Sequence, residues 1–198
     1  YILVIGRKLT KLEIDNDKLI KKSCDVVNFA EVNQVITDIK DEFQIVGLIN
    51  AAGVAERGDF TDEKHDIHNT MIDVNIKGLT NFSEVILPEM RKHNFGTIIN
   101  LSSLADRYPR PQNSVYAATK AYVKSLSDSL RIQNAKYNIR VINVAPALVA
   151  TPMVINALGI TDGTIEVEKF ANIMKFIYEQ PQDICIRDIV VAPTSYEG

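Results

Sequence analysis

The chain has 198 residues, of which 46% are hydrophobic and 24% charged, with a formal net charge of −3. These values are typical of one globular domain with a sizeable core. The acidic balance predicts no nucleic-acid partner, and no apolar run reaches the roughly 20 residues of a membrane span. Two cysteines and no signal-peptide pattern predict a reduced, cytoplasmic setting. The three histidines lack a metal-ligand pattern with the cysteines, so no metal site is expected.

Short apolar runs alternate with amphipathic stretches along the first quarter of the chain. The runs at 2–6, 23–27 and 45–49 predict buried strands. Asn28 is a plausible N-cap for a helix of about fifteen residues, because apolar residues follow it at helical spacing. The charged stretch 8–20 lacks a regular pattern and predicts a short helix or a loop.

Longer helices are expected in the rest of the chain. A long helical region is predicted from about 62 to 92, with Thr61 as a plausible N-cap and with Asn75 and Gly78 interrupting its apolar face. The predicted order then continues with strand 96–101, helix 113–137, strand 140–144, helix 166–179 and strand 188–192. Because strands and helices alternate, we predict one domain over 1–198, a Rossmann-like, doubly wound and mostly parallel α/β sheet with helices on both faces.

A Tyr-x-x-x-Lys motif, Tyr116 and Lys120, lies in the helix predicted over 113–137. Four residues make about one helical turn, so both side chains project from the same helix face. An ammonium beside a phenol lowers the phenol pKa from its usual ~10 toward the range of acid/base work. Ser103, further upstream, can orient a substrate oxygen. The stretch is interpreted as a device for moving a proton on or off an alcohol or carbonyl, although the motif alone also arises by chance in helices.

Polar residues follow the predicted strands at the edge where doubly wound folds bind ligands. Arg7 follows the first strand, Asp25 ends the second, the turn 50–53 ends the third and Ser103 ends the fourth. A cation after the first strand can bind a ribose 2′-phosphate or can be simply solvated. The glycine of the 50–53 turn allows a ligand close to the backbone, or only a tight strand exit.

Six motifs in register resemble the classical short-chain dehydrogenases/reductases over essentially the whole chain. They are Asp25-Val26, Asn-Ala-Ala-Gly at 50–53, Asn75 in Val-Asn-Ile-Lys-Gly, Ser103 in Ile-Asn-Leu-Ser-Ser, Tyr-Ala-Ala-Thr-Lys at 116–120, and Pro-Ala-Leu-Val-Ala-Thr-Pro-Met at 146–153. The resemblance implies hydride transfer between a nicotinamide and a small-molecule carbonyl or secondary alcohol. It also implies a homodimer or homotetramer, formed through the helices near 62–92 and 113–137.

The resemblance implies a role for each residue of the proton-handling stretch. Tyr116 would be the general acid/base, and Lys120 would lower its pKa and bind the nicotinamide ribose. Ser103 would hold the substrate carbonyl, for which Ser102 is the weaker candidate. Asn75 would position a water that links Lys120 to solvent.

The remaining motif residues would bind the cofactor. Arg7, directly after its strand, favours NADP(H) over NAD(H), because an acidic residue there would select the free ribose hydroxyl. The other implied cofactor ligands are Asp25 and Val26 at the adenine, Asn50, Ala51 and Gly53 at the adenine ribose, and Pro146, Val149 and Thr151 at the carboxamide and phosphates.

The sequence departs from the family pattern in three places. No strand, Gly-rich turn and helix precede the strand at 2–6, so the chain is expected to be N-terminally incomplete and inactive alone. The absent strand would lie between those at 2–6 and 45–49 in the sheet. Ala147 and Asp106 stand where glycine is usual, and both are expected to tune the substrate side.

Three other functions remain open from the sequence. A non-catalytic dinucleotide-binding regulator would keep the fold but has no need of Ser103. A truncated inactive product would lack the phosphate-binding turn. A sugar-nucleotide epimerase shares Tyr-x-x-x-Lys but carries a larger C-terminal domain than the roughly 50 residues after Pro146.

Overall fold

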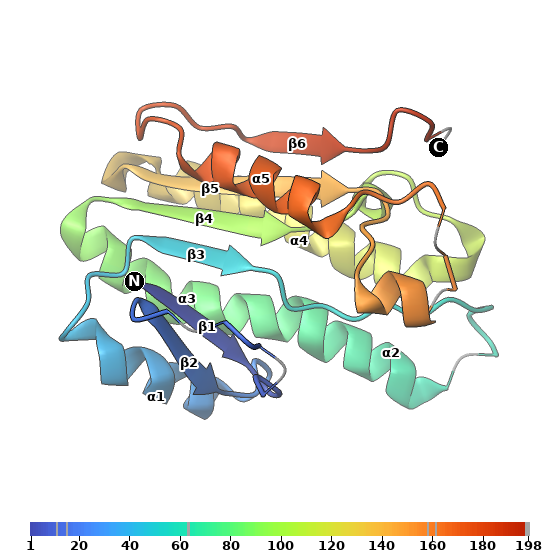
Figure 1. Cartoon of the computed structure of the whole chain (residues 1–198), viewed down its shortest axis with the longest axis horizontal. Coiled ribbons are helices and arrows are strands. Elements are labelled where there is room, and N and C mark those ends of the chain that lie inside the picture. The colour runs from blue at the N-terminus through green and yellow to red at the C-terminus, as the bar shows by residue number, and fades with distance from the viewer. Residues whose placement is uncertain (11, 15, 63, 158, 161, 197–198) are drawn as a thin grey trace.

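The structure is a computed structural model that describes residues 1–10, 12–14, 16–62, 64–157, 159–160 and 162–196. All of its strand pairings are parallel, and they form two sheets (Figure 1). The two-stranded sheet contains β1 (Ile2–Gly6) and β2 (Leu19–Ser23), and the four-stranded sheet contains, in order, β3 (Gly47–Asn50), β4 (Gly96–Leu101), β5 (Ile139–Pro146) and β6 (Asp188–Val191).

β1 and β3 each have one strand partner and one edge without a ladder in the part of the chain that the structure describes. No ladder joins these two strands to each other among the described residues. Their apolar side chains are correspondingly open, because Ile2 on β1 is 65% exposed and Ile49 on β3 is 50% exposed. Buried parallel strands normally have partners on both sides and cover on both faces. The sheet is therefore interrupted at this position.

Helices cover both faces of the four-stranded sheet. In Figure 1, α5 lies in front of this sheet and α4 lies behind it. The helices are α1 (Phe29–Lys40), α2 (His65–Ile72), α3 (Leu79–His93), α4 (Ser114–Asn134) and α5 (Val167–Tyr178). With its parallel strands, this arrangement confirms the predicted Rossmann-like, doubly wound α/β fold.

Successive residues of β4 and β5 point to opposite faces and build two separate cores. Ile98 and its register partner Val141 pack in the cluster formed with α1 and α3. Ile99 and its partner Ile142 pack in the other cluster, against Phe170 and further apolar residues of α5. All four strand residues are at most 1% exposed. Burial on both faces explains why these strands read as continuous apolar runs in the sequence.

The strand predicted over 23–27 is wrong in position. β2 is Leu19–Ser23, so it begins inside the stretch predicted as a short helix or loop. The residues that follow form a turn, in which Asp25 Oδ1 accepts a hydrogen bond from Val27 N at 3.1 Å. Asn28 then caps α1 as predicted, with its side chain accepting bonds from two backbone N–H groups. The β-branched pair 26–27 misled the prediction, because aspartate favours such local turns over a ladder.

The long helical region predicted over 62–92 is confirmed as helix from His65 to His93, but its predicted N-cap is wrong. α2 begins at His65 after Lys64, whereas the hydroxyl of Thr61 donates to Asp59 Oδ1 at 2.7 Å instead of capping a helix. A π-helical turn, Asp73–Gly78, separates α2 from α3. Such turns insert an extra residue into a helix and occur frequently at functional sites.

Candidate active site

Ser103 and Tyr116 meet at the carboxyl end of β4. Ser103 follows this strand and caps a short 3₁₀ turn, Leu104–Asp106, where its Oγ accepts a hydrogen bond from Ala105 N at 3.2 Å. Tyr116 lies in the first turn of α4, close enough to Ser103 for the side chain of Ser103 to lower the pKa of the Tyr116 phenol. The structure therefore brings together two groups that lie on different elements.

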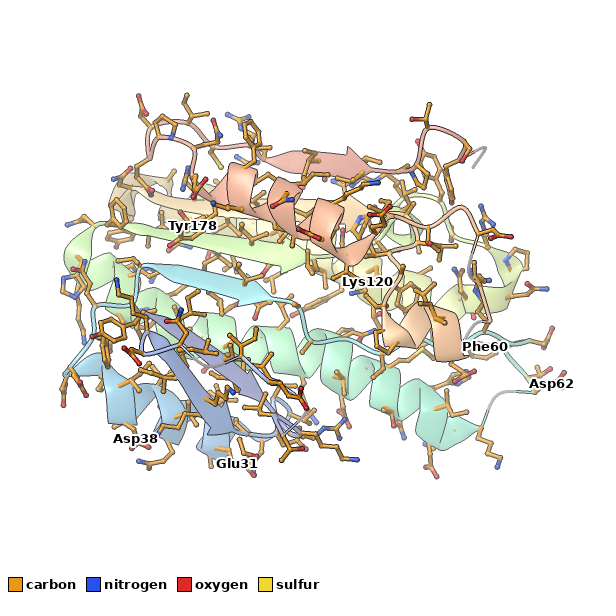
Figure 2. All side chains as sticks on the ribbon, in the orientation of Figure 1. Glu31, Asp38, Phe60, Asp62, Lys120 and Tyr178 are labelled. Atoms are coloured by element: carbon orange, nitrogen blue, oxygen red, sulfur yellow. The ribbon has the colours of Figure 1, made fainter. Side chains whose placement is uncertain are left out.

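Lys120 lies one turn further along α4 and is buried, at 6% exposure (Figure 2). Its Nζ donates to the backbone carbonyl of Leu101 at 2.9 Å, at the end of β4. The same Nζ lies 5.7 Å from the centre of the Tyr116 ring. The ammonium thus lies near the ring of Tyr116, while its hydrogen bond is directed at the strand end.

Burial dominates the proton equilibria of both groups. Desolvation raises the pKa of Tyr116, a rise that the side chain of Ser103 and the Arg57 guanidinium oppose and the Asp106 carboxylate reinforces. Desolvation lowers the pKa of Lys120 to about 8, although Asp106 acts in the opposite direction. In this structure burial raises the pKa of Tyr116, and Lys120 is not among the groups that shift it, so the lowering expected from the Tyr–Lys spacing is not seen here. Tyr116 is protonated at neutral pH.

Asn75 connects the loop after β3 to α4. It lies in the π-helical turn and is 1% exposed. Its Oδ1 accepts from Val54 N at 2.8 Å, and its Nδ2 donates to Val54 O at 2.9 Å and to Thr119 Oγ1 at 3.0 Å. The Thr119 hydroxyl donates in turn to the carbonyl of Tyr116 at 2.7 Å. Asn75 therefore fixes the first turn of α4 relative to the loop.

Gly53 lies between the two buried polar side chains of the site. A Cβ added at Gly53 would lie 3.4 Å from Asn75 Oδ1 and 3.5 Å from Lys120 Nζ. The glycine therefore brings backbone within ordinary contact of both groups, and a larger side chain would fill the space next to the ammonium. Asn75, Ser103, Tyr116 and Lys120, predicted from separate motifs, converge here.

The predicted adenine-side residues lie on the other sheet. Arg7 follows β1 and, together with Lys8, lines a hollow of about 430 Å³. Asp25 and Val26 follow the neighbouring β2, and Val26 packs against Gly78, where an added Cβ would lie only 2.7 Å from Val26 Cγ2. These residues follow β1 and β2, which form a sheet separate from the one whose strand ends carry the proton-handling residues.

The other predicted cofactor residues follow β3 and β5. Asn50 is turned into the sheet, where its Nδ2 donates to Asn100 Oδ1 at 2.8 Å, while Ala51 is exposed. Pro146 ends β5, and buried Val149 forms a bridge with Ile165. Thr151 N donates to Val149 O at 2.6 Å in a tight turn. Ala147 has no positive φ, because the only described non-glycine residues with positive φ are Asn94 and Asn138.

Sequence reasoning missed a row of polar residues across the four-stranded sheet. Asn50, Asn100, Asn143 and Asp188 are successive register partners on β3 to β6. Asn100 Nδ2 donates to the hydroxyl of Ser127 on α4 at 2.9 Å, and Asn143 Nδ2 donates to Asp188 Oδ1 at 2.8 Å. In the sequence, each of these four residues is a polar residue within a largely apolar strand, which was the only hint of the row. Only the strand register shows that the four lie side by side.

The fold and the side-chain set together define an α/β protein with an acid/base site at the carboxyl ends of parallel strands. Residues 5–158 match the family model described as short chain dehydrogenase. The chain therefore belongs to the short-chain dehydrogenase family, oxidoreductases that act on CH–OH or C=O groups with a nicotinamide cofactor.

Relatives and solved structures agree with this assignment. An uncharacterized oxidoreductase of Staphylococcus epidermidis is 30% identical over 179 residues, which cover 86% of this chain and 75% of the relative. A Haemophilus influenzae protein named "Probable NADP-dependent dehydrogenase" is 37% identical over 161 residues, 75% of this chain and 64% of the relative. Serine dehydrogenase complexed with NADP+ is 29% identical, with a TM-score of 0.90 and coverage of 99% and 87% of the two chains.

Across the residues that the structure places, no helix combines the length and the apolar character that a bilayer crossing requires.

Proposed function

We propose that this protein is an NADP(H)-dependent carbonyl reductase or alcohol dehydrogenase in which Tyr116 exchanges the proton with the substrate oxygen. The observation that carries this proposal is that Ser103 lies close enough to Tyr116 to affect the pKa of its phenol, with the buried ammonium of Lys120 5.7 Å from the ring. Two hydroxyl groups from different elements face one position, where a carbonyl oxygen can accept a hydrogen bond from each. A pure binding protein has no need of such a pair.

The protonation state of Tyr116 favours reduction of a carbonyl. The raised pKa keeps the phenol protonated at neutral pH, and the protonated form is the one that can donate. Ser103 orients the carbonyl oxygen, and Tyr116 transfers its proton to this oxygen as the C–O bond becomes single. A nicotinamide bound at these strand ends would supply the hydride to the carbonyl carbon. Lys120 stabilises the phenolate that remains. A water positioned by Asn75 then returns a proton from solvent to the site, which completes the cycle.

The chain's own residues fit a dinucleotide at the strand ends. Because Gly53 has no side chain, the position 3.5 Å from Lys120 Nζ that a Cβ would occupy stays free. Lys120 would bind the nicotinamide ribose on this side. Asp25 and Val26 would flank the adenine, and Asn50 and Ala51 would line its ribose. Pro146, Val149 and Thr151 would hold the carboxamide and phosphates. These residues follow β2, β3 and β5, so a single extended ligand would cross the whole rim.

The proposed NADP(H) preference rests on Arg7. Arg7 and Lys8 line the hollow after β1, beside the turn that carries Asp25. In this proposal the two cations bind the ribose 2′-phosphate. Similar proteins described with NADP include serine dehydrogenase complexed with NADP+ and the H. influenzae relative. Cations at this position complement a phosphate and give a free ribose hydroxyl no comparable interaction.

Replacing Arg7 by aspartate should reverse the cofactor preference. A charge-assisted hydrogen bond contributes about 1.5–3 kcal/mol, so kcat/KM for NADPH should fall roughly 10- to 100-fold, while that for NADH is retained. The measurement is kcat/KM with both cofactors at a fixed, saturating carbonyl. Lys8→Asp, measured in parallel, gives the contribution of the second cation. An unchanged NADPH-to-NADH ratio in Arg7→Asp would show that Arg7 is only a solvated cation.

A substrate panel tests the proposed activity as a whole. The full-length enzyme is mixed with carbonyl compounds and NADPH or NADH, and with alcohols and the oxidised cofactors, and the absorbance of the reduced nicotinamide is followed. We expect carbonyl-dependent NADPH oxidation with at least one class of compound. Tight NADPH binding with no turnover across the panel would instead identify a non-catalytic regulator.

We also propose that a parallel strand fills the interruption between β1 and β3 in the active enzyme and that the turn after it holds the pyrophosphate. The open edges and the exposed Ile2 and Ile49 support this placement. Hydrogen exchange of the active protein tests it, because a paired strand would protect the amides of both edges. Fast exchange along both edges in an enzyme with bound NADPH would contradict it.

Self-association stays a prediction. Ile72 on α2 and Ile132 on α4 are 44% and 69% exposed, so both of the helical regions expected to pair present apolar surface. Light scattering tests the prediction, since a monomer mass at working concentration would exclude a stable homodimer or homotetramer.

A further inference from the structure

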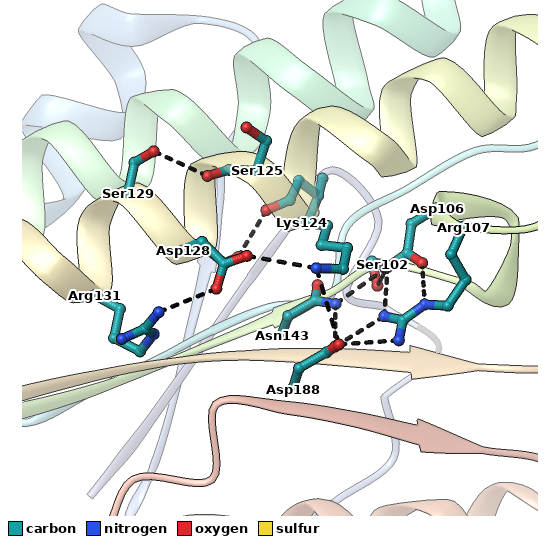
Figure 3. A network of polar contacts seen from close by, with 12 residues as sticks. Ser102, Asp106, Arg107, Lys124, Ser125, Asp128, Ser129, Arg131, Asn143 and Asp188 are labelled. Carbon is teal, nitrogen blue, oxygen red and sulfur yellow. Dashed lines mark hydrogen bonds and ion pairs between the residues drawn. The ribbon is translucent and has the colours of Figure 1, made fainter.

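A network of charged side chains contacts Ser102, the residue directly before Ser103 (Figure 3). Its centre is Asp106, at the end of the 3₁₀ turn that Ser103 caps, and the side chain of Asp106 is completely buried. Asp106 occupies the position where the sequence departs from the usual glycine. A buried carboxylate is costly unless hydrogen bonds satisfy it, so its partners show what it stabilises.

Asp106 holds the residue directly before Ser103. Its Oδ2 accepts a hydrogen bond from the hydroxyl of Ser102 at 2.7 Å. The same oxygen accepts from Asn143 Nδ2 on β5 at 3.1 Å. Ser102 N also donates to Val144 O at 2.9 Å, so both the backbone and the side chain of Ser102 are anchored to β5 or to Asp106. With this hydroxyl committed, Ser102 is oriented away from the substrate role and Ser103 is left to face Tyr116.

Arg107 joins Asp106 to the last strand of the sheet. Its Nε donates to Asp106 Oδ1 at 2.6 Å, and its two terminal nitrogens donate to the two oxygens of Asp188 on β6 at 2.9 and 2.8 Å. Although desolvation opposes the change, hydrogen bonds from Arg107 and Asn143 lower the pKa of Asp188. A guanidinium held between two carboxylates fixes the 3₁₀ turn to β6 in a specific orientation.

The charge of Asp106 also acts on the proton-handling residues. Its carboxylate raises the pKa of both Tyr116 and Lys120. The Arg57 guanidinium, on the loop after β3, acts on Tyr116 in the opposite direction. Asp188 is further along the network and pairs with Arg107 and, at 3.9 Å, with Lys124 on α4. Asp106 is therefore the member of this network whose charge acts on Tyr116 and Lys120.

We propose that Asp106 is a positioning residue for the proton transfer: its buried carboxylate holds Ser102 and Arg107, and thereby keeps Ser103 opposite Tyr116. The inference rests on the proposed function of Tyr116 as the acid/base. It assigns a specific task to a residue outside the Asn-Ser-Tyr-Lys set, and it explains why a buried charge is kept beside the site. Neutralising Asp106 must then disturb both the geometry of Ser103 and the pH dependence of the reaction.

The test is the pH profile of carbonyl reduction by Asp106→Asn in the full-length enzyme. Misplacing Ser103 should lower kcat/KM by about 10- to 100-fold, because small displacements of reacting groups have effects of this size. Loss of the negative charge lets the pKa of Tyr116 and of Lys120 fall. Reduction needs the protonated forms, so the alkaline limb of the kcat/KM profile should move to lower pH.

Asp188→Asn is the matched control. It removes the other carboxylate that pairs with Arg107, but that carboxylate is not among the charges that act on Tyr116. Its alkaline limb should stay at the wild-type pH. An equal movement in both variants would reduce the network to a structural role and overturn the inference, as would an Asp106→Asn profile with wild-type kcat/KM and an unmoved limb.

Folding and function are separated within the same experiment. Arg107 keeps Asp188 as a partner in Asp106→Asn, and thermal unfolding verifies that the variant is folded. If it is not, the double variant Asp106→Asn with Arg107→Met removes both charges of the pair and should show the same movement of the limb. Tyr116→Phe is measured alongside, because normal turnover in that variant would refute the proposed function itself, whatever Asp106 does.

Discussion

Replacing Tyr116 by phenylalanine should lower kcat for carbonyl reduction by about 10²- to 10⁴-fold, the usual contribution of a positioned general acid. The substitution removes only the hydroxyl that contacts Ser103 and leaves the ring next to Lys120 in place. The affinity for NADPH should therefore remain within about threefold of the wild type, a difference of less than 1 kcal/mol. Steady-state kinetics and a fluorescence titration with NADPH measure the two quantities separately.

Tyr122→Phe is the matched control for this variant. Tyr122 lies on the same helix, and its hydroxyl is 3.0 Å from Thr80 Oγ1, so the control also removes one phenol hydroxyl with a hydrogen-bond partner. It should leave kcat unchanged, because the hydroxyl of Tyr122 pairs with Thr80 and has no role in the proposed proton transfer. Near-normal turnover in Tyr116→Phe would mean that another group supplies the proton.

Replacing Lys120 by methionine should reduce kcat/KM with NADPH by about 10²- to 10³-fold, since a preorganised charge in a buried site contributes at this scale. The buried ammonium has one described hydrogen-bond acceptor, the carbonyl of Leu101, and lies beside the close backbone approach at Gly53. Its loss should raise KM for NADPH and lower kcat together, because the lysine acts on both the cofactor and the phenolate. Lys175→Met, an exposed lysine on α5, is the control.

The lysine also predicts a pH dependence. Desolvation lowers the pKa of Lys120 to about 8, so its positive charge is complete below this pH and is lost as the pH rises through it. The kcat/KM of the wild type should therefore fall between about pH 7 and 9, while Lys120→Met should be flat in this interval. An identical fall in both proteins would assign the titration to another group.

The sequence predicts the fold and the site well where local pattern decides. The alternation of apolar runs and amphipathic stretches is sufficient for the doubly wound class, because both faces of β4 and β5 are buried and leave continuous apolar runs. The spacing of Tyr116 and Lys120 places both on one face of a helix. The position of β2 could not be predicted in the same way, because the short apolar run at 23–27 is used in a turn and a helix cap.

Properties that depend on register and burial lie beyond the sequence. The lysine spacing suggested a lowered pKa for Tyr116, but burial of the phenol raises this pKa in the folded protein. The π-helical turn around Asn75 leaves no sequence signal distinct from a helix. From the sequence, Asp106 is recognisable only as a replacement for glycine. Its hydrogen bond with Asn143 on β5 depends on the three-dimensional arrangement of the strands.

The most direct test of the account follows the hydride itself. The full-length enzyme reduces an active carbonyl with NADPH that carries deuterium on the transferred position of the nicotinamide, and the alcohol is analysed by mass spectrometry and NMR. We predict that the alcohol carries one deuterium, bound to the carbinol carbon. Tyr116→Phe should form much less alcohol, but the alcohol that it does form should carry the same deuterium. An alcohol product without deuterium at that carbon would contradict hydride transfer from the nicotinamide and, with it, the function proposed for this site.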